Sequence, residues 1–361
     1  SFESFGSIEI YRVKRIQKRH FTTAATILSL TKKANSLKNR VDLFHSHGFP
    51  YSGIGMINRK NPLVLTAHGY ASLEMVTSRR VTENSIGFRA MRKFEQMVVN
   101  RADAIIAVDS TIENWLKEDL SASENKVYCI PNGVNVQQFS PSVDGREIRI
   151  KYGVKDNERL IVTVRRFTPK NGVETILEGF NLLKKRHGFE NVRLLLAGGG
   201  ELKEKFAKMI EENGLENSVT LEDAVPHEQV PKYFSSADII ANSFTHISGV
   251  KEFEVSSLFE ALEKARPIGT SITTLEALSS GKATVVSSPG GKFIGISSND
   301  IGVLTPDNAE ILADALAILL SNKKLVETLG KNGREYVLKK RTWNTIAERT
   351  LEVYQSAISK R

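Results

Sequence analysis

Short apolar or alternating runs, typical of strands, are interleaved along the chain with longer stretches of helical periodicity. In the first part of the chain the predicted strands are residues 7–13, 41–45, 63–68, 104–108 and 126–130, and the predicted helices are residues 22–37 and 88–100. In the second part the predicted strands are residues 160–164, 192–197, 219–221, 238–241, 284–287 and 302–304, and the predicted helices are residues 173–186, 202–213, 309–320 and 323–329.

This alternation predicts an α/β fold in which parallel sheets carry helices on both faces. A chain of 361 residues exceeds what one hydrophobic core usually supports, so two domains are expected. The turn Pro131-Asn132-Gly133 and the polar segment 140–145 mark the break between them. We predict two Rossmann-like, doubly wound domains, at residues 1–142 and 143–342, that face a ligand cleft, and a final helix within residues 343–361 that crosses back to the first domain.

The segment 270–291 is the first candidate for chemistry. Thr273 can cap a helix that starts near Thr274 and that Gly281 ends, and a buried strand follows. The amino end of such a helix suits a phosphate, and Glu276, one turn in, could accept hydrogen bonds from vicinal sugar hydroxyls. The alternative is that Thr273 and Glu276 form only a capping box.

Two glycine-rich turns follow predicted strands. Gly198, Gly199 and Gly200 come after residues 192–197, and Gly290 and Gly291 come after residues 284–287. Glycine lets backbone amides approach an anion closely. The spacing is not G-x-G-x-x-G, which argues against nicotinamide and flavin cofactors. The alternative is an ordinary strand-to-helix turn at each place.

Three cations, Arg165, Arg166 and Lys170, lie on the segment that follows the predicted strand 160–164. Charge builds on a diphosphate leaving group as its bond to a sugar breaks, and guanidinium and ammonium groups neutralise that charge. A solvated loop could also be basic, so the segment remains open to a purely structural interpretation.

Composition narrows the class of protein. With 40% hydrophobic and 25% charged residues, and without an apolar run of about 20 residues, the chain is typical of globular proteins that do not span a membrane. The single cysteine, Cys129, excludes an intramolecular disulfide and a Cys-based zinc site. His45, His47 and His68 lack a third metal ligand at a sensible spacing, and no Asp-x-Asp is present, so no metal site is predicted. His68 could hydrogen-bond a substrate hydroxyl instead.

The net charge of +9 has its densest basic patch near the amino terminus. The residues of this patch are Arg12, Lys14, Arg15, Lys18, Arg19, Lys32, Lys33, Lys38 and Arg40. A basic face could hold a peripheral enzyme at an anionic membrane, or it could simply be solvated. No nucleic-acid-binding motif accompanies the charge, so nucleic acid is not an expected partner. Because the first residues also lack a signal-peptide pattern, we expect a cytoplasmic protein, with peripheral contact at the inner membrane face as an option.

Ten segments, in order along nearly the whole chain, resemble the retaining nucleotide-sugar glycosyltransferases of family four, which have the two-domain GT-B fold. They are DLFHSHG, LVLTAHG, ADAIIAVD, CIPNGVNVQQFSP, VTVRRFTPKNGVETILEGF, LLLAGGGELKEKF, AVPHEQVPKYFSSADIIANS, TLEALSSGKATVVSSPGG, IGVLTPDNAEILADAL and RTWNTI. The resemblance implies transfer of a hexose-type sugar from a nucleoside diphosphate to a glycolipid, a polysaccharide or a small sugar, with retention of the anomeric configuration.

The resemblance also implies roles for individual residues. Arg166 and Lys170 would neutralise the donor diphosphate, with Arg165 and Asn171 as alternatives in that register. Glu276 would bind the ribose hydroxyls, and His68 would reach the transferred sugar. The remaining donor contacts would come from Gly198, Gly199, Gly200, Ala224, Val225, Ser271, Leu275, Gly290 and Gly291. The donor is a substrate, and neither a cofactor nor a protein nucleophile is implied.

Three departures from the family pattern accompany the resemblance. Ile268 occupies the position of a second glutamate that contacts the donor sugar, and residues 244–267 form an insertion just before it. The family's first strand and glycine-rich loop are expected to lie before Ser1. These departures leave a second hypothesis, a GT-B-like protein that binds sugar nucleotides without transfer. A sugar-nucleotide epimerase is a third, although no acid-base residues support it.

Overall fold

The computed structural model describes residues 2–12, 22–48, 61–69, 71–77, 81–82, 85–243, 271–287 and 301–360. The chain divides into two compact units: unit 1 comprises Ser1–Ile130 and Ala347–Arg361, and unit 2 comprises Pro131–Ile346. The first break therefore falls at the Pro131-Asn132-Gly133 turn, not at residue 142. The last helix, α14 (Trp343–Ser359), begins in unit 2 and ends in unit 1.

Unit 1 contains a four-stranded parallel sheet in the order β3-β4-β5-β6. The strands are β3 (Phe44–Ser46), β4 (Leu63–Ala67), β5 (Ala104–Ala107) and β6 (Val127–Cys129). Its other helices are α1 (Thr22–Leu37), α3 (Ala71–Thr77), α4 (Ile86–Arg101) and α5 (Ser110–Asn114). All residues of β4 and β5 are buried, as expected for central strands of a sheet covered on both faces.

The predicted strand at residues 7–13 does not join this parallel sheet. It lies instead in a separate antiparallel hairpin of β1 (Phe2–Phe5) and β2 (Ile8–Tyr11). The alternating sequence indicates a strand but does not specify its partner, and the nearest partner in the chain is β1. Ile8 and Ile10 are exposed on this hairpin, at 60% and 36% of their surface.

Unit 2 contains a six-stranded sheet in the order β12-β11-β10-β7-β8-β9, and every strand pair is parallel. The strands are β7 (Arg159–Val164), β8 (Val192–Ala197), β9 (Val219–Glu222), β10 (Ile239–Ser243), β11 (Ala283–Ser287) and β12 (Val303–Thr305). The helices are α6 (Arg146–Lys151), α7 (Val173–His187), α8 (Lys203–Glu212), α9 (Val230–Ser236), α11 (Ile272–Ser279), α12 (Ala309–Ser321) and α13 (Lys323–Lys340). These strands lie where the apolar runs predict them, whereas α6 and α9 were not predicted.

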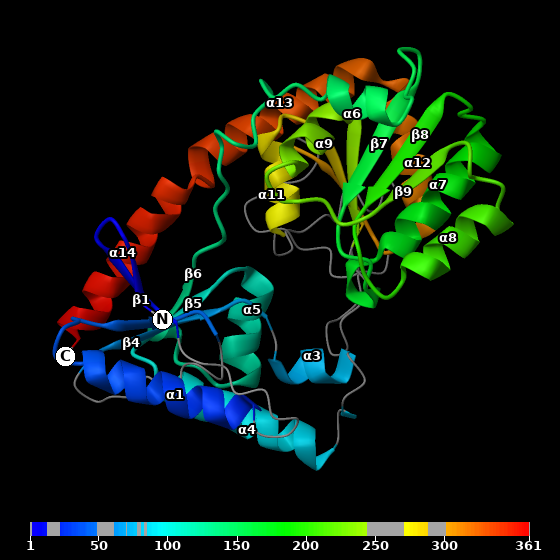
Figure 1. Cartoon of the computed structure of the whole chain (residues 1–361). Helices are drawn as coiled ribbons and strands as arrows, with labels where there is room; N and C mark the ends of the chain where they lie inside the picture. The colour runs from blue at the N-terminus through cyan, green and yellow to red at the C-terminus, as the bar shows by residue number, and fades with distance from the viewer. Residues whose placement is uncertain are drawn as a thin grey trace. The chain divides into compact units, whose positions relative to one another are not determined.

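Side chains along β7 and β8 alternate between two hydrophobic cores, one on each face of the unit 2 sheet. Ile161 and Leu194 point into the core that α7 and α12 close. Val162 and Leu195 point into the core that α9 and α11 close. Figure 1 shows α7, α8 and α12 on one side of the sheet and α6, α9 and α11 on the other. A parallel sheet buried on both faces directs its ligand contacts to the carboxyl ends of its strands.

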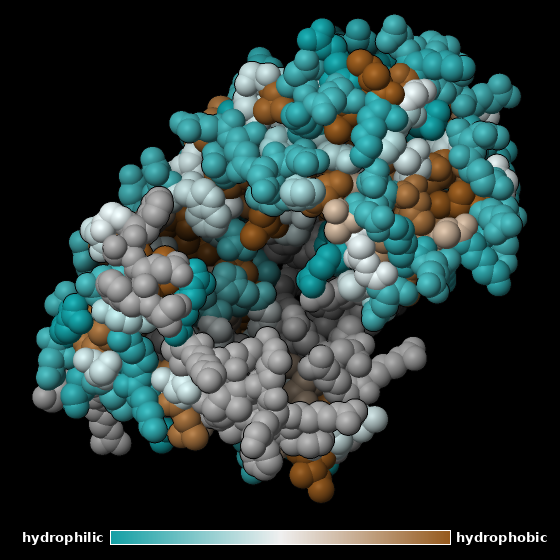
Figure 2. All heavy atoms as spheres, in the orientation of Figure 1, coloured by the Kyte–Doolittle hydropathy of each residue, from teal (hydrophilic) through white to brown (hydrophobic). Residues whose placement is uncertain are grey.

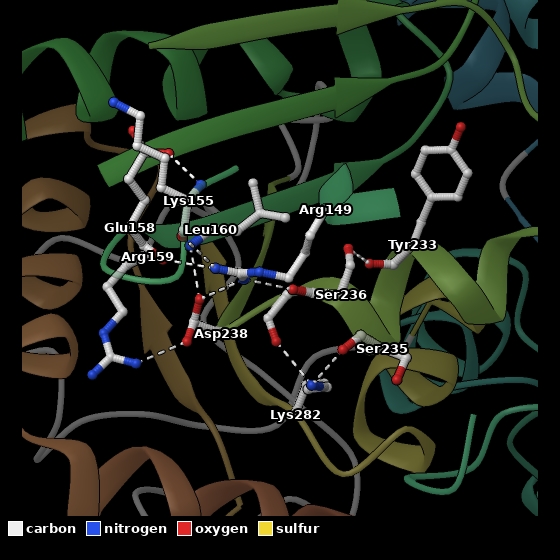
Figure 3. A network of polar contacts seen from close by, with 11 residues as sticks. Arg149, Lys155, Glu158, Arg159, Leu160, Tyr233, Ser235, Ser236, Asp238 and Lys282 are labelled. Carbon is white, nitrogen blue, oxygen red and sulfur yellow. Dashed lines mark hydrogen bonds and ion pairs between the residues drawn. The ribbon is translucent and has the colours of Figure 1, made fainter. Parts of the chain in front are cut away.

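A polar network fastens the opposite, amino-terminal edge of this sheet (Figure 3). Asp238, just before β10, accepts hydrogen bonds from the Leu160 amide (2.8 Å) and from Arg149 Nη1 (3.2 Å) through Oδ2. Its Oδ1 accepts from Arg159 Nη1 (3.0 Å). Both Arg149 and Asp238 are about a quarter exposed, with side-chain values of 23% each. One carboxylate thus ties β7 and β10 together at the edge away from their carboxyl ends.

Replacing Asp238 with alanine is expected to destabilise unit 2 by about 2–3 kcal/mol, because it leaves the Leu160 amide without its acceptor and removes one acceptor from each of Arg149 and Arg159. Urea unfolding followed by circular dichroism measures the effect. Asp144→Ala is the control, because the Asp144–Arg146 pair is exposed, at 55% and 85%, and should contribute little. Equal midpoints for the two variants would contradict the structural role of Asp238.

None of the helices in the described ranges is long and apolar enough to cross a membrane.

Figure 2 shows mostly hydrophilic residues on the visible face of unit 2, with hydrophobic patches between them. The helices of unit 2 therefore bury one face on the sheet and present a polar face outward, as amphipathic helices do.

Candidate functional site

The loop after β7, residues 165–172, is closed by an asparagine. Asn171 Oδ1 accepts a hydrogen bond from Arg165 Nη2 (3.1 Å), and Asn171 Nδ2 donates to the carbonyl oxygen of Arg166 (2.7 Å). Pro169–Asn171 form a short 3₁₀ turn within this loop. Burial, with a smaller contribution from the charge of Arg166, lowers the pKa of Arg165 to about 10, so this guanidinium remains protonated at neutral pH.

The two arginines of this β7 loop have different surroundings. Arg165 is half-buried and bonded within the loop, whereas Arg166 is exposed. Arg165 and Asn171, the alternatives considered for diphosphate binding, thus hold the loop in shape, and among the described side chains of the loop Arg166 is the exposed cation. Lys170 lies in the 3₁₀ turn, and its side chain is outside the described part of the structure.

The turn formed by Gly198, Gly199 and Gly200 packs directly against the β7 loop. A Cβ at Gly198 would lie 1.8 Å from the carbonyl oxygen of Arg165, and one at Gly200, where φ is +151°, would lie 2.3 Å from that of Phe167. The Phe167 amide donates to the carbonyl of Gly199 (2.9 Å). Glycine is required at Gly198 and Gly200 because two backbones approach each other there more closely than any side chain allows.

One prediction about this glycine turn was wrong. The amide of Gly198 donates to the carbonyl oxygen of Glu222 (3.2 Å), which continues the β8–β9 ladder, so this amide does not face an anion. Gly198 allows the close packing of the loops, and its amide is used within the sheet.

Helix α11 begins two residues earlier than predicted, and Ser271 caps it. The Ser271 Oγ accepts from the Thr274 amide (3.1 Å), so Thr273 is not the cap and does not form a capping box with Glu276. Leu275, expected among the donor contacts, is fully buried in the core, and its amide donates to the carbonyl of Ser271 (3.1 Å). Leu275 therefore packs the helix, with its side chain in the core.

Glu276 is a buried carboxylate with a histidine partner. Only 5% of Glu276 is exposed, and its Oε1 lies 2.7 Å from Nε2 of His227. Burial raises the pKa of Glu276 above its ordinary value, and the hydrogen bond and charge of His227 oppose that rise. His227 lies in the β9 loop, residues 223–229. Sequence reasoning missed it because the two residues are 49 positions apart.

Contacts connect the loops at the carboxyl edge of the unit 2 sheet. The β7 loop bonds the glycine turn through Phe167, and a Cβ at Gly199 would lie 3.4 Å from the Cβ of Ala224 in the β9 loop. The β9 loop in turn reaches Glu276 of α11 through His227. Val225 of the same loop packs against the core. The loops after β7, β8 and β9 and helix α11 therefore form one continuous surface.

Several residues singled out from the sequence lie outside the described part of the chain. They are Ile268, Gly290, Gly291, the residues of the insertion 244–267, and Lys14, Arg15, Lys18 and Arg19 of the basic patch.

His68 belongs to a histidine cluster in unit 1. Its Nε2 lies 3.1 Å from Nδ1 of His47, and His45 bonds Thr66 Oγ1 through Nε2 (2.7 Å) and Tyr354 Oη through Nδ1 (2.5 Å). Partial burial lowers the pKa of all three histidines, that of His45 to about 4. His68 is thus neutral at physiological pH and can hydrogen-bond a hydroxyl. Across the described residues, no group of three or more His, Cys, Asp or Glu side chains is arranged to hold a metal ion.

The two parallel α/β units, with their loops at the carboxyl edge of the unit 2 sheet, indicate a GT-B glycosyltransferase. Comparisons with protein families agree with this class. Residues 144–336 match the family described as glycosyl transferases group 1, and residues 6–138 match glycosyltransferase family 4. The chain belongs to the glycosyl transferases group 1 family.

Two relatives show how far the sequence similarity extends. An uncharacterised glycosyltransferase of Methanocaldococcus jannaschii is 26% identical, over 99% of this chain and 87% of its own. A D-inositol 3-phosphate glycosyltransferase of Corynebacterium efficiens is 24% identical, over 92% of this chain and 75% of its own.

Solved structures share the fold. Sucrose-phosphate synthase of Thermosynechococcus elongatus superposes with a TM-score of 0.74 at 20% identity, over 99% of this chain and 86% of that one. Anabaena HepE in complex with UDP-glucose superposes with a TM-score of 0.70 at 17% identity, over 91% of this chain and 82% of that one. The prediction of a GT-B fold is confirmed.

Proposed function

We propose that this glycosyltransferase moves a hexose-type sugar from a nucleoside diphosphate sugar to a glycolipid, a polysaccharide or a small sugar, with retention of configuration. The observation that carries the proposal is the continuous surface at the carboxyl edge of the unit 2 sheet, which joins the β7 loop with its exposed Arg166, a glycine turn and a buried carboxylate. A nucleoside diphosphate needs these three features: a cation for phosphate, backbone for close approach and an acceptor for ribose hydroxyls.

In this proposal Arg166 and Lys170 neutralise the diphosphate, and Arg165 adds a positive charge that is held within the same loop. Glu276 accepts hydrogen bonds from the ribose hydroxyls, and the base lies against the main chain of Ala224 and Val225. The backbone of Gly199 and Gly200, the capped amino end of α11 at Ser271, and Gly290 and Gly291 complete the donor contacts. His68 of unit 1 supplies a neutral imidazole to the transferred sugar.

The reaction breaks the bond between the anomeric carbon and the phosphate oxygen and forms a bond from that carbon to the acceptor oxygen. The acceptor proton passes to the departing phosphate, which remains on the same face of the sugar, so the proposal uses no protein nucleophile. Negative charge grows on the diphosphate during the step. Arg166 and Lys170 accelerate the reaction because they attract that charge more strongly in the transition state than in the bound donor. The proposal includes no metal or further cofactor.

The names of two relatives bear on the proposed acceptor. A mannosylfructose-phosphate synthase of Agrobacterium fabrum, 24% identical over 76% of this chain, and the inositol-phosphate enzyme above have names that indicate small phosphorylated acceptors. A small sugar acceptor is therefore as well supported as a lipid-linked one.

We also propose a cytoplasmic location with peripheral contact to anionic membrane through the amino-terminal hairpin and α1. Exposed Ile8 and Ile10 lie on the hairpin, and Lys33 of α1 lies over the Tyr11 ring (3.3 Å). Sedimentation with vesicles tests this contact. We expect binding to vesicles that contain phosphatidylserine, with loss at high salt, and little binding to pure phosphatidylcholine. Equal recovery with both would remove the membrane from the proposal.

The proposed function is tested with a panel of UDP-, GDP- and ADP-sugars and candidate acceptors. We expect one donor class to bind and to be consumed, with a product whose anomeric configuration, read by NMR, equals that of the donor. Binding without turnover across the panel would support a sugar-nucleotide-binding protein instead. An inverted product would exclude the retaining mechanism.

A further inference from the structure

His227 contacts both Glu276 and the ring of a fully buried phenylalanine. Its Nε2 lies 2.7 Å from Oε1 of Glu276, and its ring centroid lies 5.5 Å from that of Phe139, tilted by 54°. The His227 side chain is 63% exposed, whereas that of Glu276 is 6% exposed. The imidazole therefore lies at the surface with one edge directed at a carboxylate that is otherwise buried.

Phe139 is itself fixed to the helix that carries Glu276. Its carbonyl oxygen accepts hydrogen bonds from Ser279 Oγ (2.6 Å) and from Arg334 Nη1 (2.8 Å). Arg334 Nη1 also donates to the carbonyl of Ser279 at the end of α11 (2.7 Å). Phe139 is thus bonded to α11, and Glu276 is part of α11. Because His227 contacts both residues, its imidazole has a defined position relative to the Glu276 carboxylate.

The contact with His227 favours the charged form of the Glu276 carboxylate. Burial raises the pKa of Glu276, and among the described residues His227 is the group whose hydrogen bond and charge lower it. The other polar groups that contact α11 bond residues other than Glu276. Arg334 of α13 donates to the carbonyl of Ser279 at the end of the helix, and the neutral side chain of Asn242 in β10 donates to Thr274. An ionised carboxylate can accept hydrogen bonds from both hydroxyls of a ribose, whereas a protonated carboxyl group has one acceptor site fewer.

We propose that His227 is a positioning residue of the donor site, whose Nε2–H holds Oε1 of Glu276 and keeps the carboxylate oriented and ionised for the ribose hydroxyls. The inference rests on the proposed function, because it assigns the ribose to Glu276. In this proposal the β9 loop contributes to two donor contacts. The main chain at Val225 contacts the base, and the side chain of His227 orients Glu276, which binds the ribose. Base and ribose recognition are then linked within a single loop.

The test measures the affinity of UDP, GDP and ADP by calorimetry from about pH 5.5 to 8.5 for the wild-type protein and three variants. His227→Leu removes the donor, and His227→Gln keeps a side-chain N–H. His187→Leu is the matched control, because His187 also bonds a carboxylate, that of Asp314 (3.0 Å), in a surface pair between α7 and α12.

We expect the wild-type affinity for the nucleotide that binds to fall on acidification, at a pH above the ordinary glutamate range, because the pKa of Glu276 is raised. In His227→Leu that fall should move to higher pH, since the opposing contact is lost. The affinity should be weaker by about tenfold near pH 6 and by only a few-fold near pH 8.5. His227→Gln should recover part of the loss, and His187→Leu should follow the wild type.

A second readout needs no nucleotide. The carboxyl ¹³C resonance of Glu276, followed against pH, should report a higher pKa in His227→Leu than in the wild type. An unchanged pKa, or tighter nucleotide binding in His227→Leu, would overturn the inference, the latter because His227 would then be a competitor that the ribose displaces. Failure of every nucleotide to bind the wild type would instead overturn the proposed function, and the carboxyl titration would still decide whether His227 controls Glu276.

Discussion

Gly198→Ala is expected to destabilise unit 2 by about 3 kcal/mol or more, the largest stability change among the glycine substitutions in this turn. A methyl group there would lie 1.8 Å from the carbonyl oxygen of Arg165 and 2.9 Å from the Phe167 ring. No rotation relieves a contact between a Cβ and a backbone oxygen, so the strands β7 and β8 must separate or the β7 loop must move. Chemical unfolding, followed by circular dichroism, measures the loss.

Gly199→Ala is the control within the same turn. The added Cβ would lie 3.4 Å from the Cβ of Ala224, an ordinary van der Waals distance, so its unfolding midpoint should stay close to that of the wild type. If Gly198→Ala proved as stable as Gly199→Ala, the close approach of the β7 loop to the glycine turn would be wrong, and with it the surface on which the donor site is built.

Glu276→Gln is expected to weaken nucleotide binding by about 100-fold at pH 7.5 and to lower kcat/KM for transfer to a similar extent. Hydrogen bonds to a charged acceptor contribute about 1.5–3 kcal/mol each, and the ribose would lose that strength at two hydroxyls. Glutamine has nearly the same shape, so the fold should persist. Removing a buried charge should leave the melting temperature equal or higher, because burial already disfavours the ionised form.

Glu310→Gln is the control for the loss of one acidic side chain. Glu310 lies on α12 and is 61% exposed in a surface pair with Arg186. Its replacement should leave the nucleotide affinity unchanged. Unchanged affinity in Glu276→Gln as well would show that the ribose lies elsewhere.

The strands of unit 2 were predictable because each is a short, nearly continuous apolar run that ends in polar or glycine residues. In a parallel sheet covered on both faces, both sets of alternating side chains must be apolar, and Leu194 and Leu195 illustrate this by pointing into different cores. The hairpin of β1 and β2 was not predictable in the same way. Local alternation identifies a strand, but pairing depends on which backbone edge lies nearest after folding.

Boundaries of α11 were harder for a local reason. Ser271, Thr273 and Thr274 can each serve as a cap, and the sequence does not choose among them. Only the structure shows that the Thr274 amide meets Ser271 Oγ, which frees Glu276 from a capping box.

Parts of the candidate site could be read from the sequence, and parts could not. The positions of Arg166 and Glu276 after β7 and within α11 follow from the strand pattern. The opposite surroundings of Arg165 and Arg166 do not, because adjacent residues in a loop follow no fixed alternation. The His227–Glu276 contact is set by how the β9 loop folds over α11, which no local pattern encodes.

We propose that the carboxyl edge of the unit 2 sheet holds a nucleoside diphosphate. The most direct measurement is a crystal structure of the protein soaked with whichever of UDP, GDP or ADP binds. We expect the diphosphate beside Arg166 and the amino end of α11, and the ribose hydroxyls within hydrogen-bond distance of Glu276, with His227 still on Oε1. A nucleotide bound elsewhere, with Glu276 untouched, would contradict the account.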